Sequence, residues 1–135
     1  MKDTFEHPAL DLNNDKPLIY TALSKHLYYF RMFISKFVYE NGGVPLNPFM
    51  ISDYFMLDTV DRDAIRAGNN SVVKASHEIW VFGDVSNGVL AEIQMAKEQG
   101  KPVRYFMVVK SKDIIESTIE DVVMEEEVAE MRHLL

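Results

Sequence analysis

One glutamate follows a serine–asparagine–glycine turn in the stretch "FGDVSNGVLAEIQ". Ser86 is a favourable helix N-cap residue, so the pattern predicts a helix from about Ser86 to Gln99, with Gly88 in its first turn and Glu92 four residues later. Residues four apart share one face of a helix, and helical side chains lean toward its N-terminus. The Glu92 carboxylate is therefore expected to lie over Gly88, where no Cβ obstructs a ligand.

The predicted helix start beside Glu92 has the polarity to bind an anion. The first N–H groups of a helix have no partner within the helix, and the helix dipole adds partial positive charge there. A carboxylate next to such a start suits a polar ligand that both groups could contact. The same residues also fit a plain strand-to-helix turn, with Ser86 as the cap and Glu92 exposed to solvent. Both interpretations remain open.

The elements around this turn alternate between strands and helices. Apolar runs bounded by turn residues predict strands, and apolar residues at helical spacing predict helices. Strands are predicted over residues 17–23, 44–49, 78–83 and 102–109, and helices from Ser24 to Gly42–Gly43, over "DRDAIRAGNNSVVKASH" with a break near Gly68, and over residues 86–99. This order predicts an α/β fold, a compact three-layer α/β/α sandwich with a mainly parallel sheet of four or five strands, Rossmann- or flavodoxin-like.

The sequence divides into an arm, one domain and a C-terminal segment. Residues 1–16 are polar and predict a flexible N-terminal arm, and residues 17–110 form the α/β domain. Residues 111–135 are acidic and helix-prone, so they predict an amphipathic helical segment that packs on the domain or on a partner subunit. The apolar stripe of this segment consists of Ile115, Ile119, Val122 and Val123.

The carboxyl ends of the predicted strands indicate where a ligand binds. In doubly wound sheets, ligands lie beyond these ends. The loops that follow the first three strands carry the candidate ligand-binding residues Asn47, Gly83, Ser86, Asn87 and Gly88. The site is expected where these loops meet.

A longer motif surrounds Glu92. The pattern S-x-G-x-x-x-E, formed by Ser86, Gly88 and Glu92, follows an apolar strand and precedes A-x-x-x-G-K-P-V. Over about residues 17–109 the chain resembles the nucleoside 2-deoxyribosyltransferase-like proteins, in particular their uncharacterised branch. The resemblance implies that Glu92 is a nucleophile that attacks C1′ of a deoxyribose and releases the base. It also implies that Tyr20, in the first strand, holds the Glu92 carboxylate.

The resemblance also assigns ligand-binding roles. In nucleotide-hydrolysing members of the family, the serine–glycine part of the motif contacts a 5′-phosphate, which implicates Ser86, Asn87 and Gly88. The "NPF" after the second strand, which contains Asn47, is similar to the family's usual Asn-Pro turn. The resemblance implies no metal or organic cofactor, and it implies a homo-oligomer.

Two positions depart from the family's pattern. Where the family usually has a catalytic aspartate, this chain has Asn70, which can hydrogen-bond a base or a hydroxyl but cannot protonate a leaving group. The first strand runs into "TALSKHL", without the family's glycine. Two main hypotheses follow: a nucleoside- or nucleotide-processing enzyme that cleaves or transfers an N-glycosidic bond through Glu92, or a non-catalytic nucleotide-binding protein of the same fold. The acidic C-terminus keeps a structural oligomer subunit as a third.

Composition narrows the function classes. A net charge of −7 over 135 residues argues against a broad nucleic-acid surface, and the lack of cysteine excludes thiolate zinc sites and a cysteine nucleophile. Neither a signal peptide nor a membrane span is indicated, so a cytoplasmic protein with no membrane partner is expected. The expected ligand is a small nucleoside or nucleotide. The spacing of the four histidines does not indicate a metal site; they are His7, His26, His77 and His133.

Overall fold

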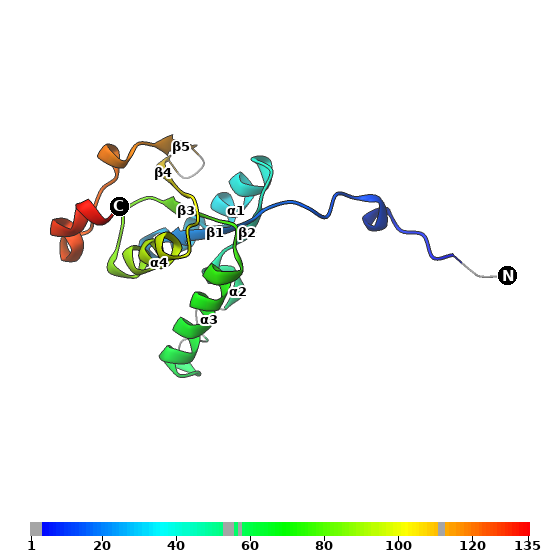
Figure 1. Cartoon of the computed structure of the whole chain (residues 1–135), viewed down its shortest axis with the longest axis horizontal. Helices are drawn as coiled ribbons and strands as arrows, with labels where there is room; N and C mark the ends of the chain where they lie inside the picture. The colour runs from blue at the N-terminus through cyan, green and yellow to red at the C-terminus, as the bar shows by residue number, and fades with distance from the viewer. Residues whose placement is uncertain (1–3, 53–55, 57, 111–112) are drawn as a thin grey trace.

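The fold is an α/β sandwich around one five-stranded sheet (Figure 1). The computed structural model describes residues 4–52, 56, 58–110 and 113–135. Along the chain the elements, with η denoting a 3₁₀-helix, are η1 Pro8–Asp11, β1 Leu18–Leu23, η2 Lys25–Phe30, α1 Arg31–Glu40, β2 Val44–Leu46, α2 Pro48–Ile51, α3 Arg62–Ala75, β3 Glu78–Phe82, α4 Asn87–Glu98, β4 Val103–Lys110, β5 Asp113–Ser117, η4 Ile119–Asp121 and η5 Glu126–Leu134. The predicted α/β class with a mainly parallel sheet is confirmed.

The sheet has the strand order β2-β1-β3-β4-β5. Strand β1 pairs in parallel with both β2 and β3, and β3 pairs in parallel with β4. The chain therefore leaves β1 toward one edge and returns across it to β3, so the order reverses between these two strands. Leu23 lies opposite Phe82, so the carboxyl ends of β1 and β3 lie at the same level. Open α/β sheets bind ligands at such a reversal.

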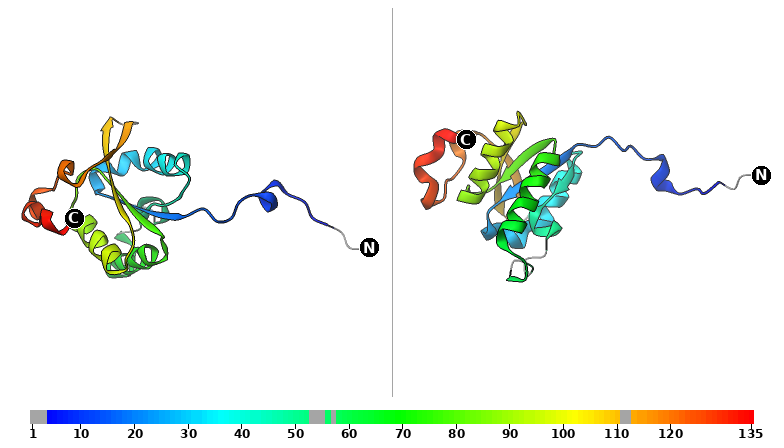
Figure 2. Two further views of the ribbon diagram at one scale, coloured as in Figure 1. Left: turned by 45° about the horizontal axis from the view of Figure 1, so that its top comes forward. Right: turned by 60° about the horizontal axis from the view of Figure 1, so that its bottom comes forward.

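Alternating strand residues build two cores, one on each face of the sheet. Helices α3 and α4 cover one face and α1 covers the other (Figure 2). Because successive strand side chains point to opposite faces, the first core takes Tyr20, Ala22, Ile79 and Val81, and the second takes Ile19, Leu23, Trp80 and Phe82. Tyr20 is fully buried beneath α3 and α4. The three predicted layers are present.

The predicted helix boundaries agree closely with the observed ones in α4, and less closely in α3 and α1. The Ser86 hydroxyl accepts a hydrogen bond from the Val89 N–H at 3.3 Å, as an N-cap does. The predicted break at Gly68 is wrong, because α3 is continuous there and the glycine lies on its exposed side. The helix predicted from Ser24 begins as η2 and becomes α-helical only at Arg31.

The predicted helix over residues 111–135 is not observed within the described part of that segment. Residues Asp113–Ser117 form β5, which pairs antiparallel with β4. Without β5, strand β4 would be the edge of the sheet and its outer backbone groups would have no partner strand. The β-branched Ile114 and Ile115 favour a strand there, opposite Val108 and Met107. The remainder contains η4 and η5 rather than an α-helix. Of the predicted apolar stripe only Val122 is buried.

The last residues pack against α4 and join the core on that face. Val122, Val128 and Leu135 are buried in it. The side chains of Gln94 and Lys97 donate hydrogen bonds to the Leu134 carbonyl at 2.9 and 3.0 Å. This end of the chain, red in Figure 2, therefore lies along the helix that carries Glu92.

The N-terminal residues 4–16 are exposed and lead away from the sandwich (Figure 1). Residues 1–3 of the predicted arm and residues 111–112 of the predicted C-terminal segment lie outside the described residues. Among the helices that the structure describes, none is both long and apolar enough to span a bilayer.

Candidate active site

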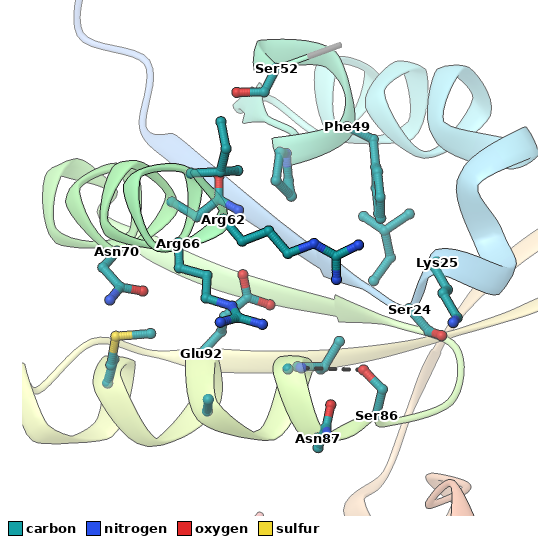
Figure 3. A pocket seen from close by; sticks show the side chains of 18 of the residues that line it. Ser24, Lys25, Phe49, Ser52, Arg62, Arg66, Asn70, Ser86, Asn87 and Glu92 are labelled. Carbon is teal, nitrogen blue, oxygen red and sulfur yellow. Dashed lines mark hydrogen bonds between the residues drawn. The ribbon is translucent and has the colours of Figure 1, made fainter. Parts of the chain in front are cut away.

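A cavity of about 810 Å³ opens at the carboxyl ends of the central strands. Its walls come from the end of β1 and the residues after it, the residues after β2, the side of α3 that faces α4, helix α4 as far as Met95, and the C-terminal segment. Figure 3 shows α3 and α4 on opposite sides of the cavity, with Glu92 projecting from α4 toward α3. The cavity therefore lies at the reversal of strand order, beyond the carboxyl ends of β1 and β3.

Glu92 is joined to Tyr20 at the wall of this cavity. The Tyr20 hydroxyl donates a hydrogen bond to Glu92 Oε2. The two residues are 72 positions apart, and they meet because Tyr20 points from β1 to the face that α4 covers. Glu92 is half-buried and lines the cavity. A side chain fixed in this way presents its second oxygen at a set position.

Burial changes the protonation of both groups. It raises the pKa of the Glu92 carboxyl from 4.5 to about 7, although the hydrogen bond from Tyr20 acts in the opposite direction. Burial, followed by the charge of Glu92 and the shared hydrogen bond, raises the pKa of Tyr20 well above its usual value. Tyr20 thus remains a donor at any physiological pH. A half-buried carboxyl with a pKa near neutrality is typical of functional sites.

Four other predicted site residues line the same cavity: Ser86, Asn87 and Gly88 at the start of α4, and Asn70 on α3. Asn70 points from α3 toward α4 in Figure 3. The structure thus brings together Glu92, the first turn of its helix and Asn70 of α3.

Asn47 and Gly83 do not line the cavity. Asn47 is 2% exposed and serves the local fold: its Oδ1 accepts the Phe49 N–H at 3.0 Å, and its Nδ2 donates to Ser35 Oγ at 3.3 Å. Gly83 has a φ of +74°, and a Cβ there would lie 2.5 Å from Leu27 Cδ1. Both residues are explained by local structure.

Gly83→Ala is expected to destabilise the protein by about 1–2 kcal/mol, because the left-handed backbone is strained with a Cβ and Leu27 must move. Gly88→Ala is the matched control. A Cβ at Gly88 meets nothing within 4 Å, and alanine favours a helix, so stability should stay within about 1 kcal/mol or rise. Urea denaturation measures both changes. Equal losses in the two variants would contradict this account.

Two arginines of the cavity wall were not predicted from the sequence. Arg62 and Arg66 extend from α3 into the space between the helices (Figure 3). They share one face of α3 with Asn69 and Asn70, at helical spacings of four, seven and eight residues from Arg62. This polar stripe is the signal that could have identified them. Arg66 also pairs with Asp63 at 3.0 Å.

Two glutamates of the C-terminal segment, Glu125 and Glu127, also line the cavity and were not predicted. Within the described ranges, no three His, Asp or Glu side chains converge where they could hold a metal ion. The arrangement offers a positioned carboxylate, amides and guanidinium groups around an open space. Such groups can bind a polar organic ligand and attack one of its carbons.

Comparisons with known proteins agree with this fold. A family model described as "Domain of unknown function (DUF7768)" matches residues 21–106. A solved structure, "2-desoxiribosyltransferase from Leishmania mexicana", superposes with a TM-score of 0.54 and 15% identity, over 87% of this chain and 97% of that one. At that identity the likeness shows the shared fold. No curated protein matches the sequence.

Proposed function

This chain belongs to the DUF7768 family, and we propose that it cleaves or transfers the N-glycosidic bond of a nucleoside or nucleotide, with Glu92 as the nucleophile. The observation that carries the proposal is the Tyr20–Glu92 hydrogen bond at the wall of the cavity. The solved structure with this fold is named for a deoxyribosyl transfer, which supports the same reaction class.

The reaction needs one carboxylate oxygen free to attack. Tyr20 engages Oε2 of Glu92, so Oε1 is the oxygen that forms a bond to C1′ of the sugar. The C1′–N bond breaks, its electron pair passes to the base, and water protonates the departing base. A water molecule or a second base then attacks C1′ of the glycosyl ester and restores the carboxylate. This is the two-step scheme of retaining glycosidases.

The remaining wall residues bind the ends of the ligand. Asn70 and the arginines on α3 face Glu92 across the cavity and can hydrogen-bond a base. The side chains of Ser86 and Asn87 line the cavity at the start of α4 and can hydrogen-bond the sugar or its substituent. The scheme uses no metal or organic cofactor. The expected homo-oligomer stays a prediction.

The test is release of free base. The wild-type protein is incubated with a panel of 2′-deoxynucleosides and their 5′-monophosphates, and free base is followed by chromatography. We expect base release from at least one substrate, and a new nucleoside when a second base is added if the enzyme is a transferase. Glu92→Ala sets the background. No release above that background across the panel would contradict the proposal.

A second candidate is a nucleotide-binding protein without turnover. The observation that favours it is Asn70, an amide that lines the cavity at the position where the resemblance to the nucleoside 2-deoxyribosyltransferase-like proteins implies an aspartate. In this case calorimetry would show nucleotide binding that survives Glu92→Gln, and no base would form with the wild type.

A further inference from the structure

The C-terminal segment contributes two carboxylates to the cavity beside the N-terminus of α4. Glu125 and Glu127 both line it. The position of Glu125 is fixed by the backbone: its N–H donates to the Val85 carbonyl at 2.9 Å, and the Val85 N–H donates to the Val123 carbonyl at 2.9 Å. These bonds hold the segment against the loop that leads into α4.

Glu127 already occupies the helix start. Its Oε1 accepts the Asn87 N–H, the first of α4, at 3.4 Å. A free helix N-terminus favours an anion, and here a carboxylate of the same chain takes that place. A ligand anion would have to displace it.

One carboxylate oxygen of Glu125 accepts no hydrogen bond from the described residues. This oxygen, Oε2, is buried. An unsatisfied buried acceptor is costly, but this oxygen is shielded, so a ligand in the cavity meets the part of Glu125 that lines the wall. A ligand O–H or N–H group can donate a hydrogen bond to a carboxylate there. A phosphate dianion has no such proton to give and would add negative charge beside two carboxylates.

The cations of the cavity lie on other elements. Lys25 follows β1, and Arg62 and Arg66 lie on α3, where Arg66 is paired with Asp63 at 3.0 Å. Among the described residues, the charged side chain that the structure shows hydrogen-bonded to the turn at Ser86–Gly88 is Glu127, although the sequence motif alone suggests a phosphate there.

We propose that Glu125 and Glu127 are specificity residues that accept a hydrogen bond from a hydroxyl group of the sugar and exclude a phosphate from the start of α4. The preferred substrate is then a nucleoside with a free 5′-hydroxyl, not its 5′-monophosphate. This inference rests on the proposed function, because it concerns the same cavity.

The experiment compares a 2′-deoxynucleoside with its 5′-monophosphate. We expect the wild-type kcat/KM to favour the nucleoside by about tenfold or more, and E125Q/E127Q to reduce that ratio by about tenfold, since removing two charges relieves repulsion of the phosphate. Glu126→Gln is the matched control: it removes the same charge from an exposed neighbour outside the cavity lining, and the ratio should not change.

Calorimetry with the same two ligands separates this inference from the proposed function. If no base is released from either substrate, the proposed reaction fails, and the ratio of the two dissociation constants still tests the specificity. Tighter binding of the nucleoside, reversed or reduced in E127Q alone or in the double variant, supports it. Equal or tighter binding of the monophosphate by the wild type overturns it, as does the same ratio in the double variant E125Q/E127Q and in E126Q.

Discussion

Glu92→Gln is expected to lower kcat for base release by about a thousandfold or more. The amide keeps the shape of the side chain, and its oxygen can still accept the hydrogen bond from Tyr20. An amide oxygen is a poor nucleophile, so the glycosyl ester cannot form. Single-turnover assays measure the rate, and calorimetry with the same nucleoside should show binding within a few-fold of wild type. Substantial residual turnover would exclude Glu92 as the nucleophile.

Tyr20→Phe is the control for this prediction, because it leaves the carboxylate in place and removes its hydrogen bond. The nucleophile must be ionised, and the pKa of Glu92 is about 7, so the wild-type rate should rise with pH and level off above that value. The hydrogen bond from Tyr20 lowers the pKa of Glu92. Its removal in Tyr20→Phe should therefore raise that pKa and shift the increase in rate to higher pH. An unchanged pH profile in Tyr20→Phe would show that the hydrogen bond does not tune Glu92.

Glu92→Gln is also expected to stabilise the protein at alkaline pH. The pKa of this carboxyl is 4.5 in the unfolded chain and about 7 in the fold, so its protonated form is favoured by folding. The contribution of Glu92 to the free energy of unfolding is fully present below pH 4.5, decreases as the pH rises toward 7, and is lost above pH 7. The variant does not titrate, so its free energy of unfolding should exceed that of wild type by up to about 3 kcal/mol at pH 8 and match it near pH 4.

Urea denaturation at the two pH values measures this difference. Glu98→Gln, an exposed substitution on the same helix, is the control and should change stability by no more than about 0.5 kcal/mol at either pH. A gain for Glu92→Gln that is the same at both pH values would contradict the linkage.

The local part of the site could be predicted from the sequence because it depends on one helix. Ser86, Gly88 and Glu92 are close along the chain, and capping and helical spacing fix their relation. The role of Tyr20 was predicted from the resemblance to a family. Strand β1 lies beside β3 in the sheet, and Tyr20 points from β1 to the face that α4 covers, where it contacts Glu92.

The rest of the cavity wall depends on contacts between distant segments. Glu125 and Glu127 reach the site because residues near 124 pair with Val85, and no local pattern encodes that pairing. The C-terminal segment has a helical sequence pattern, but backbone pairing with β4 makes residues 113–117 a strand. Asn47 was chosen for its resemblance to an Asn-Pro turn, but its amide is buried and hydrogen-bonded to Ser35 and Phe49.

The two outer strands limit how copies of this protein can associate. Strand β2 is three residues long and contains Pro45, which lacks an N–H to donate to an added strand. Strand β5 carries Asp113 and Glu116 on the opposite margin. Charges and proline at sheet margins oppose the docking of a further strand. Any homo-oligomer should therefore form through the helical layers and not by extending the sheet from one molecule into the next.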